Sequence, residues 1–382
     1  MVPFTFRFAN SSPFSYPSRN GGGRRQSSSQ EMPTSGVEYW LNSCRAHGIS
    51  KNIAIYGLQS VKQKTLISYQ KCWRKFSNWL HKWENGYSNI TVDSICKFLI
   101  YLFNSESSSG KKYSGEALNT FRSAISFFIK LDFPDLGSHV IISRLFSFFY
   151  KQRPSFPRYV VTWDVGKVLN FLASWHPPSS LSIKQLTLKT VMLIALTSSD
   201  RAQTIHALRV DRVASTPQGL EFVVFDILKT TKRGRPAKVI KCVSWDAREL
   251  DVAYYVQKYM DSTITTRWRA YKKGLGKPTQ LFLSHKSGLP VSKSTISRWL
   301  KEVMKMSGIN TNIFLPGSTR GSSISAAARR GASFSKILSA GDWSNLGTYQ
   351  RFYQRPVDDT PVGRLILEEA NVSVGNFAKL QN

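Results

Sequence analysis

The sequence predicts a mainly α-helical protein with one small antiparallel β-sheet. Between residues 61 and 150, apolar side chains recur at three- and four-residue steps, which is the period of amphipathic helices. Further helical stretches fill most of the chain after residue 160. Only two segments, LEFVVFDIL and KVIKCVSW, read as strands, and the Gly-Arg-Pro between them predicts a turn that pairs them as a hairpin.

Three apolar stripes predict the long helices of the first part of the chain. The first stripe runs from Leu66 to Leu80, the second follows the expected cap residue Thr91, and the third begins at Leu118. A shorter helical stretch at residues 141–150 completes a small bundle. Lys and Arg lie between the apolar positions of the first and third stripes, so we expect the bundle to have basic outer faces.

The second part of the chain opens with the helical segment VTWDVGKVLNFLASW. The segment LTLKTVMLIALTSSDRAQTIHALRV that follows is apolar up to Thr197, and this part is expected to be buried. The predicted hairpin comes next. After it, helices are expected to resume at residues 246–260, 294–307, 320–330, 333–340 and 345–353.

These patterns divide the chain into five segments. Residues 1–36 include NGGGRRQSSSQ, which is too polar to bury a core, and we expect a disordered basic arm. Residues 37–150 form the helical unit and residues 161–356 form the larger unit. Residues 151–160 carry two prolines and read as an extended linker between them. Residues 357–382 form a C-terminal tail.

The charge of the chain points to nucleic acid as its partner. The 53 Lys and Arg residues exceed the 23 Asp and Glu residues, which gives a net charge of +30 and an isoelectric point near 10.1. Such an excess is costly in self-repulsion unless a polyanion offsets it. The cations also run through the helical segments instead of gathering in one tail, as expected of a folded nucleic-acid-binding protein.

Several other classes are disfavoured by the same composition. No apolar run approaches the ~20 residues that a membrane span needs, and the N-terminus does not read as a secretory signal. The four cysteines are scattered without CxxC spacing, so neither a disulfide framework nor a zinc site is expected. The histidines show no ligand-like grouping either. We expect no metal and no other cofactor.

Two arginines of the second part of the chain lie at predicted turns next to helices, where the surrounding structure would fix the direction of their side chains. Arg201 follows the buried run and a polar turn, although a solvated position or an ion pair with Asp200 or Asp211 explains it equally well from sequence. Arg320 opens a helix rich in small residues, whose free N–H groups and dipole would suit a phosphate. The alternative is a packed alanine helix that leaves Arg329 and Arg330 exposed.

Two further segments carry candidate residues. The hairpin loop KTTKRGRPA is basic and suits a DNA groove, but it also fits an AT-hook, a nuclear import signal or a solvated turn. Near the C-terminus, GDWSNLGTYQRFYQR places Tyr349 and Tyr353 one helical turn apart, after Trp343. Either tyrosine could be a nucleophile or a core aromatic on local sequence alone.

Taken in chain order, the segments around Arg201, the hairpin loop, Arg320 and the two tyrosines resemble the tyrosine recombinase (phage-integrase-like) family, with the closest likeness to recombinases of DIRS-type retrotransposons. The family pattern is an Arg, a Lys in a β-hairpin, the motif His-x-x-Arg, a His or Trp, and a nucleophilic Tyr. By this resemblance the catalytic residues are Arg201, Lys229, Arg320, Trp343 and Tyr353. Lys232 is the second choice for the hairpin lysine.

The resemblance implies a fold and an activity. The fold would be a SAM-like helical DNA clamp followed by an integrase-type catalytic domain with a small antiparallel sheet. The activity would be cleavage and rejoining of double-stranded DNA through a 3′-phosphotyrosine, for integration of a mobile element. The residues expected to bind DNA are Lys62, Lys71, Arg74, Arg122, Lys232, Arg233 and Arg235.

The same likeness implies partners and a location. The C-terminal tail would dock on a neighbouring copy, giving a homotetramer that assembles on DNA. The reverse transcriptase of the same element is a further candidate partner. The expected location is the nucleus.

One position departs from the family pattern. The His of His-x-x-Arg falls on Gly317, which can neither donate nor exchange a proton. The alternative function is therefore a catalytically impaired or co-opted DNA-binding protein that derives from such a recombinase. A type IB topoisomerase would share the chemistry, but the helical unit in front argues against it. A metal-dependent transposase would need three convergent carboxylates, and the few acidic residues lie in no such context.

Overall fold

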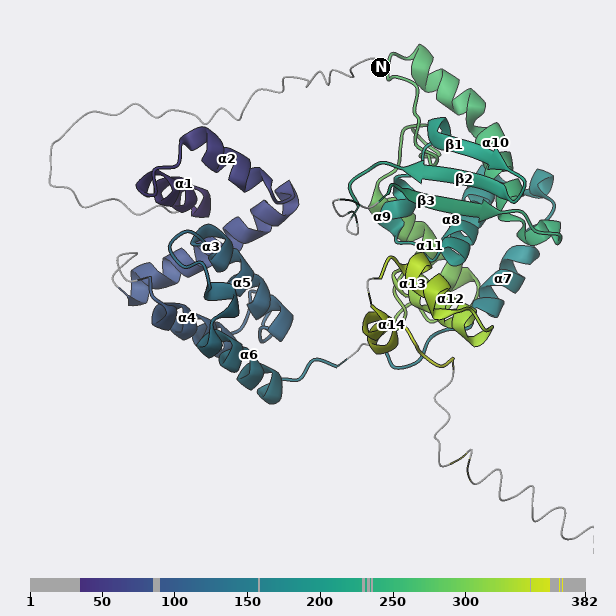
Figure 1. Ribbon diagram of the computed structural model, residues 1–382. Coiled ribbons are helices and arrows are strands. Elements are labelled where there is room, and N and C mark those ends of the chain that lie inside the picture. Colours follow the sequence, from purple (N-terminus) through teal and green to yellow (C-terminus); the bar gives the residue numbers. More distant parts are fainter. Residues whose placement is uncertain are drawn as a thin grey trace, which may run out of the picture. The chain divides into compact units, whose positions relative to one another are not determined.

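The chain forms two compact units, one up to Phe156 and one from Pro157 onward. The computed structural model describes residues 35–84, 90–156, 159–228, 231, 234, 236–343, 345–357, 364 and 366 (Figure 1). Most of the expected basic arm and most of the C-terminal tail therefore lie outside the described residues. The expected mainly helical fold with one small antiparallel sheet is confirmed.

The first unit is a helical bundle. Its core is aromatic: the ring of Trp73 lies 5.0 Å from that of Tyr39 and 5.4 Å from that of Phe128, and Trp73 and Phe128 are both fully buried. Thr91 caps its helix as expected, because its side chain accepts a hydrogen bond from the N–H of Ser94 while the Ser94 hydroxyl accepts one from the N–H of Thr91. The helices are α1 (Gly36–Ala46), α2 (Lys51–Gln59), α3 (Gln63–Trp83), α4 (Val92–Asn104), α5 (Gly115–Phe128) and α6 (Val140–Gln152).

The second unit holds the sheet and the remaining α-helices. The helices are α7 (Val165–Ala173), α8 (Ile183–Ser198), α9 (Ala202–His206), α10 (Val252–Lys272), α11 (Lys293–Met306), α12 (Ser318–Arg329), α13 (Phe334–Gly341) and α14 (Leu346–Phe352). The strands are β1 (Val213–Thr216), β2 (Gly219–Val224) and β3 (Lys238–Val243). Figure 1 shows α12, α13 and α14 grouped at the end of this unit that lies away from β1.

The core of the second unit is built around α8. All eleven residues from Leu186 to Leu196 are buried, as the apolar run predicted, and α8 packs against α10, α11, α12 and β3. The sheet is antiparallel in the order β1-β2-β3, with Phe222 opposite Ile240 on its buried face. The C-terminal end of the buried helix α8 leads through Ser199 and Asp200 into Arg201.

Two details of this unit differ from the sequence expectation. The sheet has a third strand, β1, which was not expected because no residue in it is buried and its pattern is therefore weak. The helix after the sheet was expected at residues 246–260, but α10 begins at Val252 and ends at Lys272. A short 3-10 turn, Arg248–Leu250, comes first, and the Asp251 side chain then caps α10 by accepting from the N–H of Tyr254 at 2.9 Å.

The hairpin depends on a glycine, which gives a stability prediction. Gly219 begins β2 with φ of +133°, and a Cβ there would lie 2.2 Å from the carbonyl oxygen of Cys242. We expect Gly219→Ala to lower the free energy of unfolding by about 3 kcal/mol or more, because backbone strain and a steric clash add. Urea denaturation would measure the change.

A matched control separates strain from the clash. Gly308 also has a positive φ, +78°, but a Cβ there would meet nothing within 4 Å. Gly308→Ala should therefore cost only about 1–2 kcal/mol, the ordinary penalty of a left-handed conformation. Equal costs at the two positions would show that the approach of Cys242 to Gly219 does not matter.

Candidate active site

The second unit gathers cationic, acidic and aromatic side chains around Arg320. Arg320 lies in the first turn of α12 and is only 3% exposed. Its Nη2 donates to the carbonyl of Gly341, while its Nε and Nη1 have no hydrogen-bond partner among the described residues. Burial, together with the nearby charge of Arg201, lowers the pKa of its guanidinium. A buried guanidinium with two unsatisfied donors is costly unless an acceptor joins it.

Arg201 stands at the junction of α8 and α9. Ser199 ends α8 in the left-handed conformation with φ of 55°, and Arg201 is the N-cap residue of α9. Its charge acts on Arg320, so the two arginines lie at one site although 119 positions separate them in the sequence. Neither acidic neighbour forms an ion pair with it: Asp200 pairs with Lys238, and Asp211 pairs with Arg209.

Two aromatic residues lie close to the guanidinium of Arg320. Its guanidinium carbon lies 4.8 Å from the ring centre of Trp343 and 5.8 Å from that of Tyr353. The rings of Trp343 and Tyr353 are 4.5 Å apart. Tyr353 comes directly after α14 and is partly exposed. The structure thus brings together Arg201, Arg320, Trp343 and Tyr353.

The other tyrosine of the segment has a different environment. Tyr349 is only 1% exposed and packs with Ile324 and Ile337 in a small separate core. Burial raises the pKa of its phenol. It therefore behaves as a packing aromatic beneath the partly exposed Tyr353.

Several hydrogen bonds fix the segment around Tyr353. The Ser325 hydroxyl donates to the carbonyl of Tyr353 and accepts from the N–H of Arg355 at 3.3 Å. The N–H of Thr162, in the entry to this unit, donates to the carbonyl of Pro356 at 2.7 Å. The backbone after Tyr353 is thereby held against α12, the helix that carries Arg320.

Lys238, which the sequence offers only as one of the cations of the hairpin loop, completes the site. Lys238, the first residue of β3, lies 3.0 Å from a carboxylate oxygen of Asp342 and 3.7 Å from one of Asp200. These acids directly adjoin Trp343 and Arg201. The ammonium of Lys238 therefore ties the sheet to the two turns that present those side chains. In sequence it is one more basic residue of the hairpin, and nothing there signals its bridge to Asp200 and Asp342.

Burial makes Asp200 an unusual acid. Its pKa rises from 3.8 to about 6, mainly because the carboxyl is desolvated and also because Asp342 repels its charge. Lys238, Arg320 and a hydrogen bond with Thr204 oppose the rise. The folded protein thus binds a proton at Asp200 more tightly than the unfolded chain does.

This shift predicts a pH dependence of stability. Below about pH 3 both states hold the proton. As the pH rises from about 3 to about 6 the unfolded state loses it first, so the free energy of unfolding falls by about 3 kcal/mol. Asp200→Asn removes the titration. We expect the difference in unfolding free energy between the parent and this variant to change by that amount between about pH 3 and pH 7, measured by urea denaturation. A constant difference would contradict a raised pKa.

The remaining predicted site residues lie elsewhere. Lys229, Lys232, Arg233 and Arg235 all fall in the loop between β2 and β3 and lie outside the described residues. The four other residues predicted to bind DNA belong to the first unit and are exposed or half-buried there. They are Lys62, Lys71, Arg74 and Arg122.

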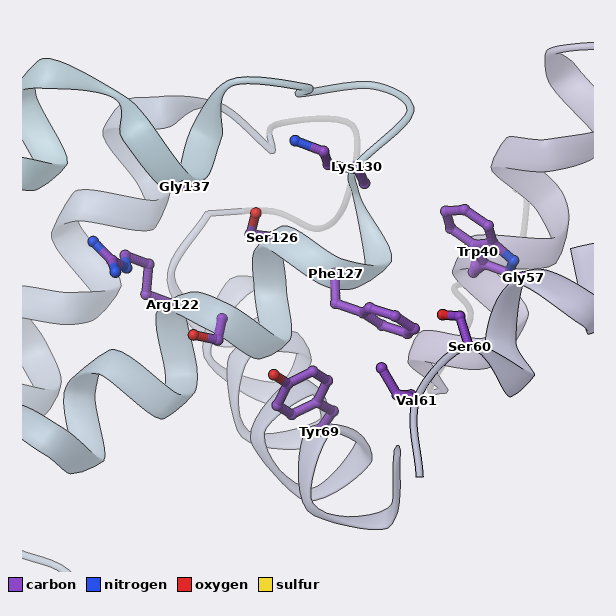
Figure 2. Close-up of a pocket in the computed structure, with 11 residues that line it drawn as sticks. Trp40, Gly57, Ser60, Val61, Tyr69, Arg122, Ser126, Phe127, Lys130 and Gly137 are labelled. Atoms are coloured by element: carbon purple, nitrogen blue, oxygen red, sulfur yellow. The ribbon is translucent and has the colours of Figure 1, made fainter. Parts of the chain in front are cut away.

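The first unit also has an open pocket of about 600 Å³ between α2, α3 and α5 (Figure 2). Trp40, Tyr69 and Phe127 line it, with Arg122 and Lys130 at its side. The indole N–H of Trp40 is already used, since it donates to the carbonyl of Ala54 at 2.9 Å. The pocket holds no acid or nucleophile arranged for catalysis among these lining residues.

Other kinds of site find no support in the part of the chain that is described. There, no cluster of three or more His, Cys, Asp or Glu residues is arranged to bind a metal. Within the same residues, no helix combines the length and apolarity of a membrane span.

Comparison with solved structures shows the fold. The chain is similar to the XerH site-specific recombinase bound to a palindromic difH substrate after cleavage, with a TM-score of 0.52 and 12% identity. It is likewise similar to XerH bound to difH before cleavage, with a TM-score of 0.51 and 12% identity. Each match covers 90% of this chain and 97% of the other. The chain therefore shares the fold of XerH. No protein-family model matches it, and no curated protein matches its sequence.

Proposed function

We propose that this protein is a tyrosine recombinase that cuts and rejoins DNA through a covalent bond between Tyr353 and a DNA phosphate. The observation that carries the proposal is the buried Arg320, whose Nε and Nη1 have no acceptor among the described residues although Arg201 and Tyr353 lie beside it. A phosphodiester is an anion with two free oxygens, which suits a pair of arginines. The fold shared with XerH, solved on its difH substrate, supports the same assignment.

The proposed chemistry follows from the placement of these groups. The phenol of Tyr353 gives its proton to solvent water as its oxygen bonds to phosphorus, and the bond from phosphorus to the 5′-oxygen breaks. Arg201 and Arg320 stabilise the charge that grows on the non-bridging oxygens. The phosphotyrosine conserves the energy of the broken bond, so rejoining needs no nucleotide cofactor. Trp343 forms the wall against which Tyr353 packs.

A lysine would supply the proton that the leaving 5′-oxygen needs. We propose Lys229, with Lys232 as the alternative, because the loop between β2 and β3 starts and ends beside the site. Lys238 does not suit this role, because its ammonium is held by two carboxylates. It serves instead to position Arg201 and Trp343.

The biological setting is also part of the proposal. The likeness of the sequence to DIRS-type recombinases supports integration of a mobile element in the nucleus, with the element's reverse transcriptase as a candidate partner. Recombination exchanges strands between two duplexes, so we propose a homotetramer that forms on DNA through the C-terminal tail. The cations of the first unit, on α3 and α5, would hold the duplex.

A second candidate function is DNA binding without cleavage. Gly317 favours it, because the position that carries a proton-exchanging His in the family has no side chain here. Trapping on a nicked suicide substrate, from which the cut fragment diffuses away, separates the two candidates. A covalent protein–DNA adduct that forms in the presence of a metal chelator supports the recombinase. Salt-sensitive binding without any adduct supports the binding protein.

A further inference from the structure

The end of α10 carries an exposed aromatic surface with a high density of positive charge. Its apolar members are Ile264, Trp268, Tyr271 and Leu275, which are 52%, 48%, 55% and 56% exposed. We call these four residues, with the neighbouring cations Arg269, Lys272, Lys273 and Lys277, the α10 platform. In Figure 1 the last turns of α10 extend beyond β1, away from α12, α13 and α14.

The platform is rigid because its buried side is anchored. Arg267, which precedes Trp268 and belongs to the buried face of the helix, is 4% exposed and donates to the carbonyls of Pro278, Gln280 and Leu281, each at 2.7 Å. These bonds fold the chain after Lys277 back onto α10. An exposed aromatic pair on an anchored helix end loses little entropy when a ligand binds.

The charge of the platform selects an anionic partner. Nine Lys and Arg residues and no Asp or Glu occur between Asp261 and Glu302. The Nζ of Lys277 lies 5.3 Å from the ring centre of Trp268, and the rings of Trp268 and Tyr271 meet edge to face at 5.7 Å. A cation that can bind a phosphate and an aromatic ring on which a base can stack therefore lie close enough to contact the same nucleotide.

We propose that the α10 platform binds single-stranded nucleic acid, with an unpaired base stacked on Trp268 and the backbone held by Lys272, Lys273 and Lys277. Proteins that bind single strands combine aromatic rings with a cationic path in this way. A duplex hides the faces of its bases and would use only the cations. The inference goes beyond the proposed cleavage reaction and does not depend on it, since no residue of the platform belongs to the candidate active site.

Crosslinking to the full-length protein tests where a single strand binds. The probe is an oligonucleotide of about 12 nucleotides that carries 5-iodouracil, within the length that single-strand sites occupy. We expect peptide mapping to find adducts at Trp268 or Tyr271, and Trp268→Ala to remove them. Trp245 is 62% exposed and lies beside Asp246, outside the platform, so Trp245→Ala is the matched control.

Binding measurements give the magnitude. Fluorescence anisotropy with a labelled oligothymidylate should show that Trp268→Ala weakens binding by about 5-fold to 150-fold, the range for loss of one stacked base. Trp245→Ala and the binding of a duplex should change little. The proposal is wrong if crosslinks map only to other regions and the two tryptophan variants bind alike, or if Trp268→Ala weakens attachment to anionic lipid vesicles and not to the oligonucleotide.

Discussion

Tyr353→Phe should abolish the covalent adduct with a nicked DNA substrate, whereas Tyr349→Phe should retain it. The two tyrosines lie one helical turn apart, but only Tyr353 is partly exposed beside Arg320 and Trp343. Tyr349 is buried, and the raised pKa of its phenol makes it a poorer nucleophile. Loss of the nucleophile costs on the order of 10⁶-fold in rate in a covalent enzyme, which would leave no detectable adduct.

The variants also report on folding. Tyr349→Phe removes one hydroxyl from the small core it shares with Ile324 and Ile337, so its cost in stability should stay near 1 kcal/mol. Thermal melting should give similar curves for both variants and the parent. An adduct that survives Tyr353→Phe and disappears in Tyr349→Phe would reverse the assignment of the nucleophile. Binding of an intact duplex should persist in both, since neither change removes a positive charge.

The sequence predicted those parts of the fold that a strong local pattern specifies. The apolar run of α8 and the amphipathic stripes of α3, α4 and α5 were foreseen because their buried residues are large and periodic. α1 and α2 were not foreseen as helices. In α1 the buried residues are Gly36, Ser43 and Cys44, which are too small or too polar to mark a face.

The candidate site shows a similar limit. Arg201 and Arg320 could be named from sequence because each stands at the start of a helix, after a turn. The bridge made by Lys238 could not, because its partners Asp200 and Asp342 are remote in sequence, the latter by 104 positions. Only the packing of β3 against the α8–α9 turn and the end of α13 brings these charges together, and no local pattern encodes that packing.

Gly317→His should increase the rate of DNA cleavage. Gly317 is the N-cap residue of α12, with φ of −65° and ψ of −18°, and a Cβ placed there would meet nothing within 4 Å. A Cβ at this position therefore fits without backbone strain. Residues three apart share a helix face, so an imidazole at 317 would lie on the side of Arg320 and of the phosphate it is proposed to bind.

The size of the gain follows from the role of such a group. A well-placed acid or base contributes about 10²–10⁴ in rate, and the imidazole pKa near 6.5 lets it exchange a proton at neutral pH. Single-turnover cleavage of the nicked substrate would measure the increase. Gly317→Ala is the matched control, because it adds the same Cβ without a titrating group and should give no gain.

The comparison of these two variants decides between the two candidate functions. If Gly317→His raises cleavage and Gly317→Ala does not, the arginines, Trp343 and Tyr353 form an intact site whose rate is limited by one missing group. If both variants fold and neither cleaves, restoring that group is not sufficient, and DNA binding without catalysis becomes the better account. The open space at Gly317 makes the comparison direct, because the Cβ that both variants add meets no neighbour within 4 Å and the variants then differ only in the imidazole.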